Sequence, residues 1–216
     1  MDHLTHAGWV VGVVIAVVDY GIGNLRSAEK ALQHLGADAQ LTSDAREIGS
    51  AHAVVIPGVG AFGSCMHALR DAGLEGVAKE AATDGRPFLG ICIGMQMLFD
   101  GSDETPDVAG LGVVPGRITR LPSSERLPQI GWNTLEIRNG SRLGAALPDP
   151  AWLYFVHSYA PAPEDDGVVA AWCEYGRRFA AAIEVGPLWA VQFHPEKSGA
   201  VGLRLMQNFV DAANAA

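Results

Sequence analysis

Apolar and polar positions alternate along the first half of the chain in blocks that are typical of an α/β fold. Short apolar runs predict buried strands at 13–18, 39–41, 53–56 and 87–89. Between them, apolar residues recur every three or four positions and predict helices at 25–35, 62–71 and 74–83. Because strands and helices take turns, we expect a parallel sheet with helices on both faces.

The second half of the chain has a different pattern, in which strand-like runs are joined by turn residues. These runs lie at 112–121, 132–138, 152–159, 168–175, 179–184 and 188–193. They predict antiparallel ribbons that extend the open sheet. A last helix is predicted at 202–213, with Leu205 and Phe209 on one face. We therefore expect one domain at 13–216, an open, mostly parallel sheet flanked by helices with an antiparallel extension.

Composition narrows the classes of partner. The chain has 216 residues, 49% of them hydrophobic, and a net charge of −9. Nucleic acids and anionic membranes bind basic surfaces, so we expect neither as a partner. The apolar run at 7–18 is too short to span a bilayer, and no Lys or Arg precedes it as in a signal peptide. Residues 1–12 are expected to be an N-terminal extension.

Cysteine and glycine spacing excludes several kinds of site. Cys65, Cys92 and Cys173 are widely separated, which disfavours disulfides and zinc and favours a reducing, cytoplasmic setting. The histidines that belong to no other motif show no ligand spacing, so we expect no metal. The segment 19–24 is similar to the start of a dinucleotide fingerprint, but Arg26 stands where the third glycine would fall. We therefore expect no cofactor.

The most informative motif is Gly-Ile-Cys-Ile-Gly at 90–94, directly after the predicted strand at 87–89. Small residues around a cysteine let the chain bend sharply between a strand and a helix, as in the nucleophile elbow. Such a bend would expose the Cys92 thiol, and the N-terminus of the next helix would favour its thiolate. The alternative is a buried structural cysteine, which is common for an isolated free cysteine.

A candidate base lies in His-Pro-Glu at 194–196, after the predicted strand at 188–193. In extended chain, side chains two residues apart leave on the same face, so the Glu196 carboxylate can hold the His194 imidazole in one tautomer. A histidine near Cys92 would stabilise the thiolate and later return a proton. We therefore predict that Cys92, His194 and Glu196 act together, which favours the nucleophile over the structural cysteine.

Three further segments are candidates for the same site. Pro-Gly-Val-Gly-Ala-Phe at 57–62 lies on the same sheet edge as Cys92, and its glycines would let N–H groups form an oxyanion hole, unless it is only a tight turn. Gln96 lies one helical turn after Cys92 and faces either this pocket or solvent. The segment 157–159 offers backbone and hydroxyl groups to a polar substrate, although His157 alone is as compatible with a core position.

Together these motifs resemble class I glutamine amidotransferases, the glutaminases with a Cys-His-Glu triad. The resemblance runs from about residue 14 to the C-terminus, and its most specific segments are 90–96 and 193–197. Further segments resemble the branch of the family that serves imidazole glycerol phosphate synthesis in histidine biosynthesis, namely 19–25, 57–62, 131–133 and 157–159. Gln129 stands where that branch often has a histidine.

The resemblance implies a role for each candidate residue. Cys92 would attack the side-chain amide of L-glutamine, His194 would protonate the departing ammonia and then activate water, and Glu196 would orient His194. The oxyanion hole is implied to use the backbone at Val59, Gly60 and Ile93. Substrate glutamine is implied to bind at Gly58, Gly60, Gln96, His157, Ser158 and Tyr159.

The resemblance also implies a partner. Because the glutaminase pattern fills the chain, we expect another chain to consume the ammonia. The implied partner is a (βα)8-barrel cyclase/synthase subunit, joined in a heterodimer, that passes the ammonia to a ribonucleotide acceptor. Candidate partner contacts are Asn24, Trp132 and Lys197.

Three alternatives stay open. The first is another hydrolase class with a cysteine elbow, either a cysteine-dependent α/β-hydrolase or an amidase of the Cys-His chaperone–protease type. An α/β-hydrolase has its acid before its histidine in the chain, whereas Glu196 follows His194. The second is a non-catalytic scaffold subunit. Loss of a catalytic residue would favour it, yet Cys92, His194 and Glu196 are all present. A glutaminase of another pathway, serving chorismate or pyridoxal phosphate synthesis for example, is disfavoured by Val59 and by the segment 21–24.

Overall fold

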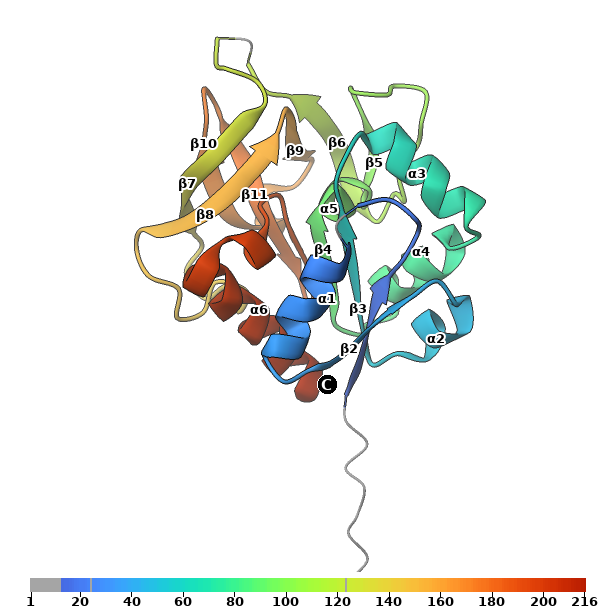
Figure 1. Ribbon diagram of the computed structural model, residues 1–216. Coiled ribbons are helices and arrows are strands. Elements are labelled where there is room, and N and C mark those ends of the chain that lie inside the picture. The colour runs from blue at the N-terminus through green and yellow to red at the C-terminus, as the bar shows by residue number, and fades with distance from the viewer. Residues whose placement is uncertain (1–12, 24, 123) are drawn as a thin grey trace, which may run out of the picture.

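Two β-sheets organise the chain, as Figure 1 shows. The computed structural model describes residues 13–23, 25–122 and 124–216. In the larger sheet, nine strands lie in the order β2-β1-β3-β4-β12-β11-β10-β7-β8, and the smaller sheet has the order β5-β6-β9. The expected N-terminal extension, residues 1–12, and the candidate partner contact Asn24 lie outside the described residues.

The first half of the chain forms the parallel part of the larger sheet, as its alternating pattern predicts. Its strands are β1 (Val14–Val18), β2 (Asp38–Thr42), β3 (Ala53–Gly58) and β4 (Phe88–Cys92). Its helices are α1 (Leu25–His34), α2 (Ala45–Ser50), α3 (Phe62–Asp71) and α4 (Glu75–Thr83). Every residue of β3 and β4 is buried, which is typical of parallel strands covered on both faces.

Helices lie on both faces of the larger sheet. Helix α1 packs against the C-terminal helix α6 (Gly199–Asn214) on one face, and α2 packs against α4 on the other (Figure 1). Leu25, Ala28 and Leu32 are the buried residues of α1, and they form the stripe that the sequence predicts. Leu205 and Phe209 are likewise buried in α6.

The second half of the chain forms the antiparallel extension, also as predicted. Its strands in the larger sheet are β7 (Gln129–Ile137), β8 (Ala151–His157), β10 (Val169–Glu174), β11 (Arg178–Val185) and β12 (Leu188–Val191). The smaller sheet consists of β5 (Phe99–Ser102), β6 (Val114–Arg120) and β9 (Tyr159–Pro163). The shortest helices are α5 (Ile93–Gln96), η1 (Asp166–Val168) and η2 (Pro195–Lys197). Within the described residues, no helix has the length and apolar character needed to cross a membrane.

Three elements differ from the sequence prediction. The strand predicted at 152–159 is two strands, β8 and β9, which lie in different sheets on either side of Ser158. The prediction lacks α2 because this short helix buries Ile48 alone and is held by Asp44, which caps its first turn. The prediction also lacks β5, because Asp100 and Gly101 are residue types that are rare in strands.

Strand β12 joins the two halves and brings distant parts of the chain to one edge. It pairs in parallel with β4 and antiparallel with β11. Because β3, β4 and β12 are adjacent and parallel, their carboxyl ends meet at the same edge of the sheet, where ligands bind in open α/β folds. Gly58 and Cys92 are register partners at this edge, and His194 follows the end of β12.

Close contact between backbones accounts for both glycines of the segment 90–94. A Cβ atom on Gly94 would overlap the carbonyl oxygen of Ile56 in β3, and one on Gly90 would lie 2.9 Å from the carbonyl oxygen of Gly94. Both oxygens belong to the backbone, so a larger residue would displace the main chain rather than a flexible side chain. The turn that carries Cys92 therefore sits directly against β3.

This contact predicts the effect of a single added methyl group. We expect Gly94→Ala to lower the free energy of unfolding by about 3 kcal/mol, measured by urea denaturation. Gly76→Ala in α4 is the matched control, because no atom lies within 4 Å of the added methyl group, and it should stabilise the protein by about 0.5–1 kcal/mol. Equal urea midpoints for both variants would contradict this account of the turn.

Candidate active site

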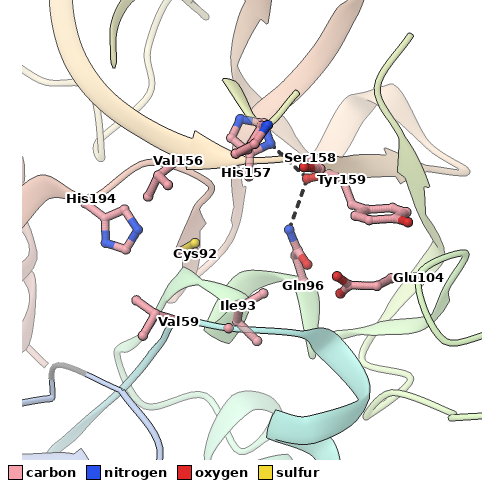
Figure 2. Close-up of a pocket in the computed structure, with 12 residues that line it drawn as sticks. Val59, Cys92, Ile93, Gln96, Glu104, Val156, His157, Ser158, Tyr159 and His194 are labelled. Carbon is pink, nitrogen blue, oxygen red and sulfur yellow. Dashed lines mark hydrogen bonds between the residues drawn. The ribbon is translucent and has the colours of Figure 1, made fainter. Parts of the chain in front are cut away.

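Cys92 stands at a strained turn between β4 and α5. Its backbone has φ 54° and ψ −109°, a conformation that non-glycine residues adopt at a cost of about 1–3 kcal/mol. The turn directs the sulfur into a cavity of about 260 Å³ (Figure 2). The residues that line it are Val59, Gly60, Cys92, Ile93, Gln96, Glu104, Pro128, Val156, His157, Ser158, Tyr159 and His194.

Two expectations about the surroundings of Cys92 are wrong. The thiol is not exposed on the surface, because Cys92 is only 3% exposed and is reached through the cavity, whose wall includes the segment 156–159. The following helix is also not long enough to supply a strong dipole, since α5 contains four residues. Stabilisation of a thiolate must therefore come mainly from neighbouring side chains.

His194 and Glu196 form a buried pair beside Cys92. The imidazole Nδ1 lies 2.8 Å from Glu196 Oε1, and the two side chains are 1% and 6% exposed. The chain is not extended throughout, as the sequence had suggested, because Glu196 lies in η2. The pair forms nevertheless, since the one-turn helix directs the carboxylate back toward the ring.

Strand β8 anchors the backbone on either side of the histidine. The His194 N–H donates to the carbonyl oxygen of Tyr154 at 2.9 Å. The Ser198 hydroxyl donates to the His194 carbonyl at 2.6 Å and accepts from the Tyr154 N–H at 2.9 Å. These three hydrogen bonds fix the position from which the imidazole reaches the cavity.

The charge on His194 follows from its neighbours. Burial alone would lower the pKa of the imidazole, but its interactions with Cys92 and Glu196 outweigh burial and raise the pKa to about 9. His194 is therefore protonated at neutral pH. Its Nε2 has no hydrogen-bond partner within the described part of the chain, so this N–H remains available for a group in the cavity.

The segment 157–159 is held by two side chains that share one backbone acceptor. His157 Nδ1 lies 2.8 Å from the carbonyl oxygen of Tyr159, and Gln96 Nε2 donates to the same oxygen at 3.1 Å (Figure 2). Gln96 is thus buried and directed at the cavity wall rather than exposed on a helix face. The segment that was predicted to bind substrate is therefore fixed relative to α5.

His157 is a neutral ring beside the cavity. Burial lowers its pKa to about 4, and the Tyr159 carbonyl opposes this shift only in part. Because a carbonyl oxygen only accepts, the neutral ring carries its proton on Nδ1. Its Nε2 is a buried acceptor with no partner among the described residues.

The turn at 57–62 borders the cavity opposite the segment 157–159. Val59 and Gly60 line the cavity, and Gly60 has φ +110°, a conformation that favours glycine. The turn is held from below, since the Tyr20 hydroxyl donates to the Pro57 carbonyl at 2.8 Å and the Cys65 thiol donates to the Val59 carbonyl at 3.5 Å. Gly58 does not line the cavity but lies directly beside Cys92 in β3.

Two functional candidates escaped the sequence analysis. Glu104 lines the cavity, and its Oε2 accepts from the Phe62 N–H at 2.8 Å. It follows the unpredicted strand β5, so no local pattern marks it. Gln192 is fully buried and donates to the sulfur of Cys92 at 3.7 Å. Its signal was a single polar residue within the apolar run at 188–193.

Trp132 and Lys197, the candidate partner contacts within the described residues, are both exposed. Trp132 in β7 is 53% exposed, and its ring packs edge-on against Tyr154 of β8, with 6.1 Å between ring centroids. Lys197 is exposed at the end of η2, three residues after His194. No cluster of three or more possible metal ligands occurs in the ranges 13–23, 25–122 and 124–216.

The fold and a cysteine facing a His-Glu pair at one sheet edge define a class of enzyme. Over residues 16–213 the chain matches the family described as "Glutamine amidotransferase class-I", and it belongs to that family. It is 48% identical to the imidazole glycerol phosphate synthase subunit HisH of Methanothermobacter thermautotrophicus, over 94% of this chain and 100% of the relative. It is 46% identical to the subunit of the same name from Rhodopirellula baltica, over 92% of this chain and 98% of the relative.

Solved structures share the architecture. The structure of PurLQS from Thermotoga maritima has a TM-score of 0.74 at 21% identity, covering 93% of this chain and 98% of that one. A crystal structure described as a glutamine amidotransferase has a TM-score of 0.70 at 24% identity, covering 94% and 99%. At these identities the likeness shows the fold alone. It agrees with the α/β architecture that the sequence predicts.

The buried neutral His157 predicts how stability depends on pH. In the unfolded chain a histidine binds a proton near pH 6.5, whereas folded His157 does so near pH 4, so stability is present above pH 6.5 and is lost as pH falls to 4. His157→Asn keeps a donor for the Tyr159 carbonyl but removes the titration. Between pH 6.5 and pH 4, we expect the unfolding free energy of this variant to fall by on the order of 3 kcal/mol less than that of the wild type. Urea titrations at each pH measure the difference.

The control for this comparison is His67→Asn, because His67 is exposed on α3. This variant should follow the pH dependence of the wild type. Parallel pH curves for His157→Asn and the wild type would show that His157 is not buried in the neutral form.

Proposed function

We propose that this chain is the glutaminase subunit of an imidazole glycerol phosphate synthase, and that it delivers ammonia to a synthase partner in histidine biosynthesis. The observation that supports hydrolysis most directly is the cavity lined by both Cys92 and His194, with Glu196 bound to the Nδ1 side of the imidazole. The assignment to this pathway rests on relatives of that name that are 46–48% identical over nearly the whole chain.

In the first half of the reaction, the Cys92 thiolate attacks the side-chain amide carbon of L-glutamine. The carbonyl oxygen gains negative charge in the tetrahedral intermediate. Backbone N–H groups at Val59, Gly60 and Ile93, which line the cavity, are the donors proposed for this oxyanion. As the C–N bond breaks, His194 gives its Nε2 proton to the leaving nitrogen, and ammonia departs from a γ-glutamyl thioester.

In the second half, water cleaves the thioester. Neutral His194 accepts a proton from the water as its oxygen bonds to the thioester carbon. Collapse of this intermediate expels the Cys92 thiolate and releases glutamate. Glu196, bound to Nδ1, keeps Nε2 directed at the cavity in both steps and stabilises the imidazolium. This restores the thiolate and imidazolium with which the cycle began.

The cavity also suits the amino-acid end of glutamine. Its volume of about 260 Å³ lies just below the range of about 300–1,000 Å³ for sites of drug-sized ligands. Figure 2 shows the Glu104 carboxylate on the far side of Gln96 from Cys92. A carboxylate in that position complements the α-ammonium group of a glutamine whose side chain reaches Cys92. Ser158 and Tyr159 offer polar groups on the adjacent wall.

An exposed apolar strip beside the cavity is the proposed docking face for the partner. Ile130, Trp132 and Trp152 are 64%, 53% and 50% exposed, and they lie on one face of the β7–β8 ribbon. Val156, the register partner of Ile130, continues the strip and lines the cavity. A (βα)8-barrel cyclase/synthase subunit bound here would receive ammonia close to where it forms. Lys197, exposed in η2, is a candidate polar contact.

We place this activity in the cytoplasm, as an expectation supported by thiol chemistry. Cys65, Cys92 and Cys173 are all free. Free thiols persist in reducing compartments, and the mechanism needs Cys92 reduced.

Removing the nucleophile tests the mechanism. We expect Cys92→Ala to abolish glutamine-dependent synthesis in the assembled synthase, because no thioester forms. Synthesis from added ammonium salts should continue at close to the wild-type rate, since the partner is unchanged. The control is Cys173→Ala in β10, which should keep both activities. Glutamine turnover by Cys92→Ala would show that another residue is the nucleophile.

Removing Trp132 tests the docking face. Because exposed tryptophans often dominate interfaces, we expect Trp132→Ala to weaken binding to the barrel subunit by about 2 kcal/mol, roughly 30-fold in Kd, by titration calorimetry. Val185→Ala is the matched control, because Val185 is a 44% exposed apolar residue outside the β7–β8 ribbon. It lies beside the first residue of β12, whereas His194 follows the carboxyl end of that strand. Equal affinities for both variants would place the partner elsewhere.

A further inference from the structure

Two buried glutamine amides connect the substrate-binding segment to the catalytic sulfur. Gln96 Nε2 donates to the Tyr159 carbonyl at 3.1 Å and to Gln192 Oε1 at 2.9 Å. Gln192 Nε2 then donates to Cys92 Sγ at 3.7 Å. We call Gln96 and Gln192 the amide relay. Both residues are nearly or fully buried, at 2% and 0% exposure.

The direction of each hydrogen bond in the amide relay is fixed by one backbone atom. The two ends of a glutamine amide are usually assigned only from their hydrogen bonds. Here the Tyr159 carbonyl can only accept, so the Gln96 atom that faces it must be nitrogen. This NH2 group also faces Gln192, whose near atom must then be oxygen. The amide nitrogen of Gln192 is therefore the atom that faces Cys92.

The sulfur consequently receives an N–H donor from Gln192, whose amide oxygen accepts from Gln96 of α5. A hydrogen bond donated to the charged form of a group favours that form. Because α5 contains only four residues, its helix dipole does little to stabilise a Cys92 thiolate. The Gln192 N–H provides a further dipole that points at the sulfur. Gln192 follows the end of β12, two positions before His194, so the same strand delivers both neighbours of the sulfur.

We propose that Gln192 is a catalytic residue, whose N–H stabilises the Cys92 thiolate before attack and again when it leaves the thioester. Gln96 is a positioning residue in this scheme, because it sets the direction in which Gln192 points. The proposal rests on the proposed glutaminase function of the site. It adds no chemical step to the mechanism. The sulfur still uses one electron pair to bond to the amide carbon and recovers that pair when the thioester breaks.

The charges of the titratable groups around the Cys92 sulfur indicate that Gln192 and His194 are the groups that stabilise its thiolate. Burial raises the pKa of Tyr20 and raises that of Cys65 to about 11, so both are neutral beneath the site. Burial also lowers the pKa of His157 to about 4, so this ring is neutral above it. The His194 imidazolium is then the cationic neighbour, with Glu196 behind it, and Gln192 is a neutral donor that acts at every pH.

Gln192→Glu tests the proposal because it replaces the amide nitrogen that donates to the sulfur with a carboxylate oxygen, which accepts. A glutamate of nearly the same shape can still accept from Gln96, but it presents an acceptor to the sulfur. We expect the pH midpoint for alkylation of Cys92 by iodoacetamide, followed by mass spectrometry of the Cys92 peptide, to rise by about one unit or more. In the assembled synthase, kcat for glutamine should fall by about 100-fold, while ammonium-dependent synthesis stays unchanged.

Gln192→Met separates loss of the donor from the added charge, and it keeps the proposal testable if the glutamate variant does not fold. The alkylation midpoint should move in the same direction by a smaller amount. Gln40→Glu, on the exposed edge strand β2, adds the same charge far from the site and should leave the midpoint and kcat as in the wild type.

The outcomes distinguish this proposal from the proposed function. A folded Gln192→Met variant with the wild-type alkylation midpoint would overturn the role of Gln192, whatever the enzyme does with glutamine. A wild-type protein that hydrolyses no glutamine with its partner would contradict the proposed function instead. In that case the alkylation midpoints still decide whether Gln192 stabilises the thiolate.

Discussion

The contact of the Cys92 turn with β3 is the constraint on which the site depends. At Gly94 the two backbones approach so closely that no side chain fits between them. This contact holds a residue of unfavourable φ in place and aims its sulfur at the cavity rather than at solvent. Since β3, β4 and β12 are parallel neighbours, the turn at 57–62 and the His194–Glu196 pair arrive at the same edge. The geometry of the site thus follows from strand order.

Much of this arrangement could be predicted from local patterns. The alternation of apolar runs and helical spacing predicted the parallel half except for α2, because the other strands and helices there are long enough to show their period. The segment 57–62 was predicted to lie beside Cys92 because both follow parallel strands at one sheet edge. His194 was assigned to the same site by its chemistry, as the partner of a cysteine nucleophile. The family that these motifs resemble is the one to which the chain belongs.

The remaining features depend on tertiary contacts that leave little trace in the sequence. The burial of Cys92 is set by the segment 156–159, which is distant in the chain. Glu104 enters the site from a turn after β5, a strand with a polar residue and a glycine at its centre. Gln192 looks like a residue of a buried strand, and only its neighbours show that its amide has a direction.

The depth of the sulfur has a consequence for selectivity among amides. The Cys92 sulfur is 3% exposed and is reached through a cavity of about 260 Å³ rather than across the open surface. A glutamine within a polypeptide carries main chain on both sides of its Cα, which hinders its entry more than that of a free amino acid. The burial of the sulfur therefore favours small amides over the side-chain amides of other proteins as reactants.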